Sequence, residues 1–200
     1  LMTLLFLPFY LIGLGPWILY FGQTLVIALG ALPIFWLARE KYGEDNQFTA
    51  LFPLAYLLYL PTVNITFQGY YPVALAITPL LFAAYYLIKE KHLPFCLWLL
   101  AAALCQENTY LVAAGFGIYI LIFKKHKWLG AALALSGAAA FIGAITYIIP
   151  SFNHAGKYEY YQRYAYLGQS IPEVINTMIT RPLFVLGHVL TGDKILYLTG

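Results

Sequence analysis

The chain has 200 residues, of which 62% are hydrophobic and only 10% are charged, and its formal net charge is +3. Soluble domains carry about 25% charged residues, so this composition cannot supply a water-facing surface, and lipid must be the solvent for most of the chain. The small net charge also gives no indication of a nucleic-acid partner.

The first half of the chain is expected to cross the membrane repeatedly. Residues 1–14 are apolar but contain Pro8 and Gly13, which is typical of an interfacial or re-entrant approach, or of the end of a truncated span. A crossing helix needs about 20 apolar residues. Runs near this length predict spans over 17–38, 47–62 and 72–88.

The stretch 94–123 is long for one span and carries polar residues in its middle. A glutamate at the membrane midplane is costly, and Glu107 lies there between Gln106 and Asn108. Lysines flank both ends of the stretch, and basic loops favour the cytoplasmic side. A hairpin of two short helices is therefore favoured over a single long span.

A last span is predicted over 128–149, where Ala and Gly permit close helix packing in lipid. The positive-inside rule then places the loops with Arg39, Lys89 and Lys124 on the cytoplasmic side of the cell (plasma) membrane. The fold class that follows is an all-α, multi-span transmembrane helix bundle.

The sequence becomes more polar from residue 151 onward. Pro172 and Glu173 suit the first turn of a helix, and an apolar stripe follows at helical spacing. Amphipathic helices on the outer face of the bundle are expected here. The predicted organisation is a transmembrane bundle over 1–150 and an extracytoplasmic segment with amphipathic helices over 151–200.

No catalytic or metal-binding motif is evident, and the candidate substrate-binding residues are polar groups that map to the side opposite the basic loops. Glu107 is the most informative, because an ionisable residue in apolar sequence indicates function in a membrane protein, although a hairpin turn also suits it. The full set consists of Gln68, Tyr71, Gln106, Glu107, Asn108, Lys157, Arg163 and Tyr164.

These candidates have structural alternatives. Tyrosines at a span boundary are first of all belt residues, although Tyr71 could also stack on a sugar. An arginine beside tyrosines suits a phosphate or a glycan, as at Arg163 and Tyr164, but a solvated loop flanking the membrane has the same composition.

A set of short motifs occurs in an order that resembles a known family. The motifs include Leu7-Pro8-Phe9-Tyr10, Gln23-Thr24-Leu25, Gly30-Ala31-Leu32-Pro33, Tyr71-Pro72-Val73, Gln106-Glu107-Asn108 and Arg163-Tyr164. Together they resemble a prokaryotic family of polytopic membrane proteins, domain of unknown function 2079, over nearly the whole chain. That family in turn resembles the GT-C glycosyltransferases, which take a sugar from a polyprenyl-phosphate carrier on the non-cytoplasmic face.

The resemblance implies a GT-C-like helix bundle with short half-length helices, and a catalytic acid in a first outer loop that would precede Leu1. The chain departs from the family at two motifs. Where the family usually has Asp-Phe-His-Pro, this chain has Gly69-Tyr70-Tyr71-Pro72, and where it has Lys-Glu-Asp, this chain has Gln106-Glu107-Asn108. No cofactor is therefore expected, and a divalent metal, possible in the family, is not supported by these residues.

Three functional hypotheses follow. The first is a GT-C-like glycosyltransferase, or a fragment of one, with a polyprenyl-phosphate sugar donor and a glycan or lipid acceptor. The second is a non-enzymatic membrane protein, either transporter-like or a scaffold bundle, since transporters also use broken helices with charges near the midplane. The third is a fragment that has lost activity.

Overall fold

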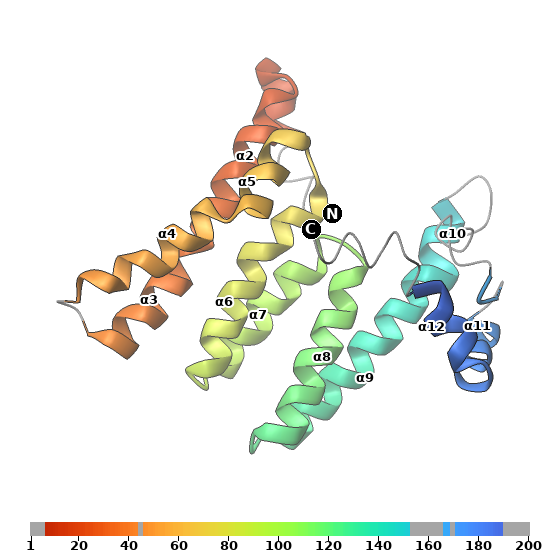
Figure 1. Ribbon diagram of the computed structural model, residues 1–200. Helices are drawn as coiled ribbons and strands as arrows, with labels where there is room; N and C mark the ends of the chain where they lie inside the picture. The colour runs from red at the N-terminus through yellow and green to blue at the C-terminus, as the bar shows by residue number, and fades with distance from the viewer. Residues whose placement is uncertain (1–6, 44–45, 153–165, 169–170, 190–200) are drawn as a thin grey trace. The chain divides into compact units, whose positions relative to one another are not determined.

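The computed structural model describes residues 7–43, 46–152, 166–168 and 171–189. Every regular element in these ranges is helical, which confirms the all-α class (Figure 1). The chain divides into two compact units, Leu1–Ile142 and Gly143–Gly200, and each is described by itself.

The first unit begins with an interrupted helical segment. Helix α1 (Leu7–Phe9) and the π-helical turn η2 (Tyr10–Leu14) precede α2 (Trp17–Leu29). Gly13 has a φ of +90°, a left-handed conformation that glycine adopts without the steric cost of a Cβ. The helical path therefore breaks before Trp17, as the glycine and proline content of this segment predicts.

The next helices, α2 and α3 (Ala31–Tyr42), meet at Gly30. The Gly30 N–H donates to the carbonyl of Ile27, and the Val26 carbonyl accepts instead from the hydroxyl of Thr78 at 2.5 Å. A Cβ at Gly30 would lie 2.6 Å from the hydroxyl of Tyr56 and 2.9 Å from that of Thr78, so a side chain here would displace both hydroxyl groups. The junction is thus held by side chains from two other helices.

The following segment consists of η3 (Gln47–Ala50), α4 (Leu51–Leu58) and α5 (Leu60–Gln68). Tyr59 has an extended backbone and separates α4 from α5, and Pro61 occupies the first turn of α5. This new start carries the helix to Gln68, whereas the sequence predicts a span that ends at 62. Gln68 is therefore the last residue of a helix and not part of a loop.

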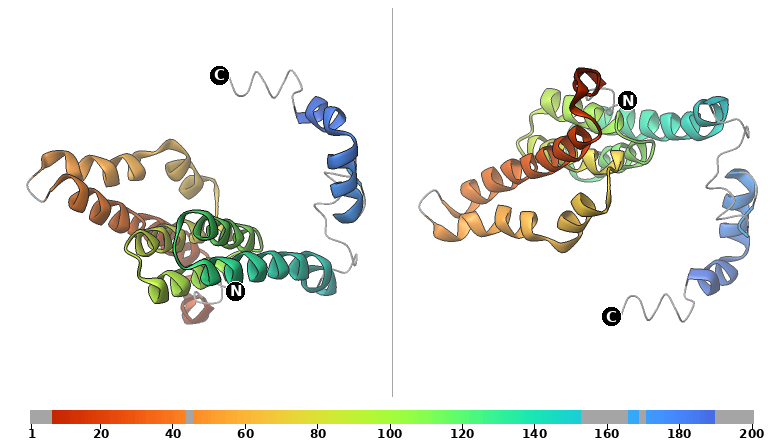
Figure 2. Two further views of the ribbon diagram at one scale, coloured as in Figure 1. Left: turned by 90° about the horizontal axis from the view of Figure 1, so that it is seen from below. Right: turned by 90° about the horizontal axis from the view of Figure 1, so that it is seen from above.

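The remaining helices of this unit form antiparallel neighbours. They are η4 (Pro72–Ala76), α6 (Ile77–Ile88), α7 (His92–Ala103), α8 (Asn108–Phe123) and α9 (Lys127–Gly143). Figures 1 and 2 show α7 beside α6, and α9 beside α8. The stretch 94–123 is divided between α7 and α8, which confirms the expected short half-length helices.

The core lies between α6, α7 and α8. Its fully buried members include Phe95, Leu99 and Ile120, and half-buried rings pack around them. A second, smaller cluster joins η4 to the α7–α8 turn through Leu75 and Cys105. The core therefore fixes the hairpin against the preceding helix.

Glycines allow α8 and α9 to approach closely. A Cβ on Gly117 would lie 2.7 Å from the carbonyl oxygen of Gly130, and one on Gly137 would lie 2.7 Å from the carbonyl oxygen of Tyr110. Small residues at such positions are typical of helix packing in membranes, where the hydrophobic effect does not drive association. The glycine content predicted this contact but not its partner.

Among the described residues, three helical segments are long and apolar enough to cross a membrane: Trp17–Tyr42, Phe48–Gln68 and Lys127–Phe152. The apolar helices η4–α6, α7 and α8 are shorter. Large apolar side chains face outward, including Phe21 and Leu58, each 67% exposed. Such a surface is stable only against an apolar solvent or partner.

The second unit contains η5 (Ala144–Ile148), α10 (Ile149–Phe152), α11 (Ile171–Thr180) and α12 (Pro182–Val189). Within it, the Tyr166 ring stacks on the His188 ring with centroids 4.7 Å apart. Ile175, Met178 and Ile179 are exposed along α11, so this helix carries the predicted apolar stripe on its surface.

Candidate functional site

The Gln106–Glu107–Asn108 motif lies at the turn between α7 and α8. The Gln106 carbonyl accepts from the hydroxyl of Thr109 at 2.5 Å, and the Glu107 carbonyl accepts from the Tyr110 N–H at 3.0 Å. These bonds lie at the start of α8: Gln106 and Glu107 directly precede the helix, and Asn108 is its first residue. The side chains of Gln106 and Glu107 are half-buried, while Asn108 is exposed.

The segment before η4 is held by the buried side chain of Gln23. Its amide nitrogen donates to the carbonyls of Ile65 at 3.2 Å and Gly69 at 3.1 Å, and its oxygen accepts from the Tyr71 N–H at 2.7 Å. Gln23 is 0% exposed. One buried side chain therefore satisfies three backbone groups where α5 ends.

Glycine is required inside this segment. Gly69 has a φ of +147°, which a side chain rarely allows, and its carbonyl is one of the Gln23 partners. The chain thereby turns from α5 toward η4 while its polar groups stay paired. Sequence reasoning did not single out Gln23 as a site residue, although an amide within an apolar span is a signal that could have found it.

The segment before η4 and the Gln106–Glu107–Asn108 motif are joined by residues that were not among the predicted site residues. Tyr70 packs against the cluster of Leu75, Ala76 and Cys105, and Cys105 directly precedes Gln106. The side chain of Tyr71 is exposed, and its backbone N–H is the group that is held. We call the residues Gln68–Tyr71 and Gln106–Asn108 the polar end.

Three further candidates, Lys157, Arg163 and Tyr164, lie outside the described residues. Among the residues that the structure does describe, no three side chains of His, Cys, Asp or Glu gather in a way that could hold a metal ion.

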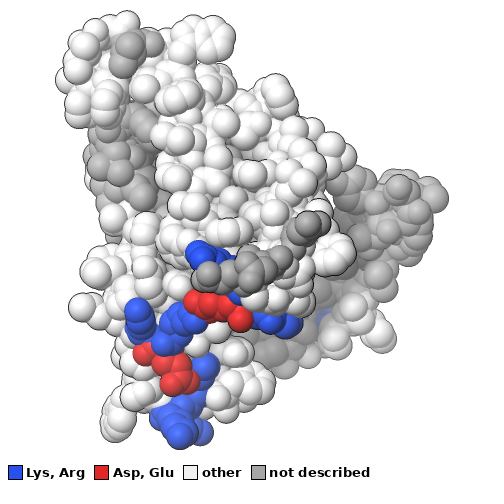
Figure 3. Space-filling view, turned by 90° about the vertical axis from the view of Figure 1, so that its left-hand side faces the viewer, with Lys and Arg blue, Asp and Glu red and all other residues white. Residues whose placement is uncertain are grey.

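Charged side chains gather at the other ends of the same helices. We call this set the charged end; it comprises Arg39, Glu40, Lys41, Lys89, Glu90, Lys91, Lys124, Lys125 and Lys127. Figure 3 shows charged residues in one band on a face that is otherwise uncharged wherever it is described. The ammonium of Lys124 lies 3.3 Å from a carboxylate oxygen of Glu90, which brings the two basic loops that flank the hairpin together.

Two histidines reinforce that junction. The rings of His92 and His126 lie with centroids 4.3 Å apart, one from the start of α7 and the other from the loop before α9. Together with the Glu90–Lys124 pair, they place both ends of the α7–α8 hairpin at the charged end. The hairpin thus leaves the charged end and returns to it, as the distribution of lysines predicts.

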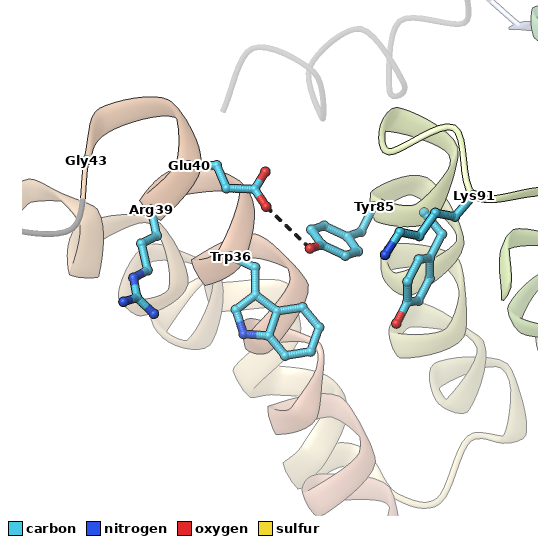
Figure 4. Close-up of a pocket in the computed structure, with 7 residues that line it drawn as sticks. Trp36, Arg39, Glu40, Gly43, Tyr85 and Lys91 are labelled. Carbon is cyan, nitrogen blue, oxygen red and sulfur yellow. Dashed lines mark hydrogen bonds between the residues drawn. The ribbon is translucent and has the colours of Figure 1, made fainter.

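A hollow of about 640 Å³ opens at the charged end (Figure 4). Its walls come from α3, from the end of α6 and from the loop that follows α6. The residues that line it include Trp36, Arg39, Glu40, Tyr85, Tyr86 and Lys91. Nothing in the sequence pattern indicated that these residues come together.

A family model described as "Predicted membrane protein (DUF2079)" matches the chain over residues 1–200. No curated protein and no solved structure matches it. The family resemblance drawn from the motifs is thereby confirmed, whereas these comparisons do not show the further resemblance of the family to GT-C glycosyltransferases.

Proposed function

The chain belongs to the DUF2079 family of predicted membrane proteins, and from this premise we propose that it acts as a GT-C-like glycosyltransferase. The donor would be a polyprenyl-phosphate sugar, and the acceptor a glycan or a lipid, on the non-cytoplasmic face of the plasma membrane. The loops with Arg39, Lys89 and Lys124 would then face the cytoplasm, in keeping with their lysine and arginine content.

The observation that carries the proposal is the construction of the polar end. Gln23 fixes the backbone of Gly69 and Tyr71, and Tyr70 packs against the cluster that contains Cys105, the residue before Gln106. The hydrogen-bonding side chains of the two segments of the polar end are therefore held by the same packed cluster. Enzymes gain from such rigid mounting, because binding groups already positioned for the substrate lose little entropy when it binds.

The roles in this proposal are binding roles. Glu107, Gln106 and Asn108 offer acceptors and donors suited to sugar hydroxyls, and Tyr71 and Gln68 extend the surface on the adjoining segment. Lys157, Arg163 and Tyr164 are proposed from sequence alone to approach the lipid phosphate.

One observation favours a second candidate function, that of a transporter. Helix α7 has 12 residues and α8 has 16, so at about 1.5 Å per residue neither crosses a hydrocarbon core of about 30 Å. If the protein is a transporter, Glu107 at their junction would lie within the membrane, where transporters place broken helices and ionisable groups.

Transfer assays with the full-length protein test the proposal. The protein is expressed in membranes and supplied with labelled polyprenyl-phosphate sugars, and incorporation into lipid and glycan acceptors is measured. Replacing Glu107 by Gln should lower the transfer rate about tenfold or more, because hydrogen bonds to charged groups are worth about 1.5–3 kcal/mol.

The matched control is Glu90→Gln, the same substitution at the charged end, which should leave the transfer rate unchanged. Absence of transfer from every donor would contradict the proposal, as would an equal loss in both variants. Solute uptake by vesicles containing the protein, abolished in Glu107→Gln, would establish the transporter instead.

A further inference from the structure

The hollow at the charged end combines cations with aromatic rings. In Figure 4 Arg39 and Lys91 stand on opposite walls, with Trp36 and Tyr85 between them. The Trp36 and Tyr85 rings lie with centroids 5.4 Å apart. The hollow is therefore a pocket with an aromatic floor and a positive charge on either side.

The one described carboxylate on the wall is already paired. Glu40 forms an ion pair with Lys89 and accepts a hydrogen bond from the Tyr85 hydroxyl at 3.4 Å. Lys91 forms no ion pair with any residue in the described part of the chain. The described residues that line the hollow thus include two cationic side chains, Arg39 and Lys91, and one carboxylate, Glu40, whose charge is balanced by Lys89.

These groups have the chemistry of a phosphate site. Arginine presents two parallel N–H groups that match two phosphate oxygens, and lysine adds a compact charge. The size of the pocket, about 640 Å³, falls within the range of small-molecule sites. The two cationic side chains favour an anion among the ligands that fit.

The setting of the pocket favours a lipid as the source of that phosphate. Ile88, where α6 ends, is 58% exposed, and Figure 3 shows that the described surface next to the charged band carries no charged side chains. Tryptophan and tyrosine are enriched at the level of lipid head groups. A lipid could place its head group in the hollow and its acyl chains along these helices.

We propose that the hollow lined by Trp36, Arg39, Tyr85 and Lys91 binds the phosphodiester head group of an anionic phospholipid. Basic pockets between membrane helices take such head groups, and an anionic lipid places its phosphate at the depth of this charged band. The proposal is independent of any glycosyl transfer, because the pocket lies at the end opposite the Glu107 motif.

Native mass spectrometry of the full-length protein in detergent tests this assignment. The protein is titrated with phosphatidylglycerol and, separately, with phosphatidylcholine, and the fraction of lipid-bound protein gives the dissociation constant. Phosphatidylglycerol should bind more tightly. Lys91→Gln should weaken its binding about fivefold, and the double variant Arg39→Gln/Lys91→Gln about 25-fold.

Two controls separate a built pocket from general attraction to positive charge. The double variant Lys125→Gln/Lys127→Gln removes two cations from the charged end outside the pocket and should change binding less than twofold. Lys91→Arg keeps the charge and should retain binding. If Lys91→Gln loses binding and Lys91→Arg does not, the loss is due to the missing charge and not to a disturbed fold.

Three outcomes would overturn the proposal. One is an equal affinity for phosphatidylcholine, and another is an equal loss of affinity in the Lys125/Lys127 control. The third is displacement of phosphatidylglycerol by millimolar inorganic phosphate, which would identify a site for a soluble anion instead.

Discussion

The polar end and the charged end of the first unit are stabilised in different ways. At the polar end one buried amide, that of Gln23, satisfies three backbone groups. At the charged end exposed ion pairs such as Glu90–Lys124 hold the loops, and rings such as Trp36 and Tyr85 pack beside them. The difference indicates that the polar end is fixed in geometry, whereas the charged end is a surface exposed to ions and solvent.

The largest effect should follow from Gln23→Leu. Leucine has a similar size but leaves the carbonyls of Ile65 and Gly69 and the N–H of Tyr71 without their partner. At about 1 kcal/mol for each buried group, the free energy of unfolding should fall by about 3 kcal/mol. The measurement is unfolding by sodium dodecyl sulfate in mixed micelles, followed by circular dichroism.

Thr24→Val is the control for this substitution. Thr24 is exposed, and its hydroxyl donates only to Tyr20 in the preceding turn of α2. Its loss should change stability by less than about 0.5 kcal/mol. If Gln23→Leu were as mild as Thr24→Val, the polar end would not depend on this amide.

The close contact between α8 and α9 should tolerate substitution less than an open helix face does. In Gly117→Ala the new methyl group meets the backbone of Gly130 and Ala134 on α9. The helices must separate to admit it, so we expect a loss of about 2 kcal/mol in unfolding free energy.

Gly115→Ala provides a matched control on the same helix. No heavy atom lies within 4 Å of the Cβ that this substitution would add. Alanine has the higher helix propensity, so stability should stay the same or rise by up to about 1 kcal/mol. An equal loss in both variants would refute the close packing of α8 on α9.

The smallest effect is expected at the charged end. Glu90→Gln removes the exposed pair with Lys124, and such pairs contribute about 0.5 kcal/mol. The difference from wild type should shrink further at high ionic strength, because salt screens exposed charges. Unfolding measured at low and at high salt checks this. A salt-independent loss above 2 kcal/mol would show that the charged end is as firmly built as the polar end.

The sequence predicted the hairpin but not what holds it. The lysines on both sides of 94–123 and the polar motif in its middle were sufficient to place Glu107 at a turn between α7 and α8. The sequence indicated Tyr71 rather than Tyr70, the ring that packs against the cluster containing Cys105, because loop residues show no periodicity that would indicate which ring turns inward.

Neither Gln23 nor the hollow could be found in the same way. The partners of Gln23 are backbone atoms 42 to 48 residues away. Because backbone groups are the same in almost every residue, the sequence does not show which of them a side chain will bind. The hollow exists only because α3 packs beside α6, which brings Arg39 near Tyr85. The hairpin could be predicted because it depends on local charge and hydropathy. Gln23 and the hollow could not, because they depend on how distant segments pack.

We expect the polar end and the charged end to lie on opposite faces of the membrane. Single cysteines at Gln68→Cys and Lys125→Cys, in a chain with Cys96 and Cys105 replaced by Ala, test it directly. Both positions are exposed, so each can react with a thiol reagent that does not cross membranes. Right-side-out vesicles should label Gln68→Cys only, and inverted vesicles Lys125→Cys only. Labelling of both positions from the same side would contradict the account.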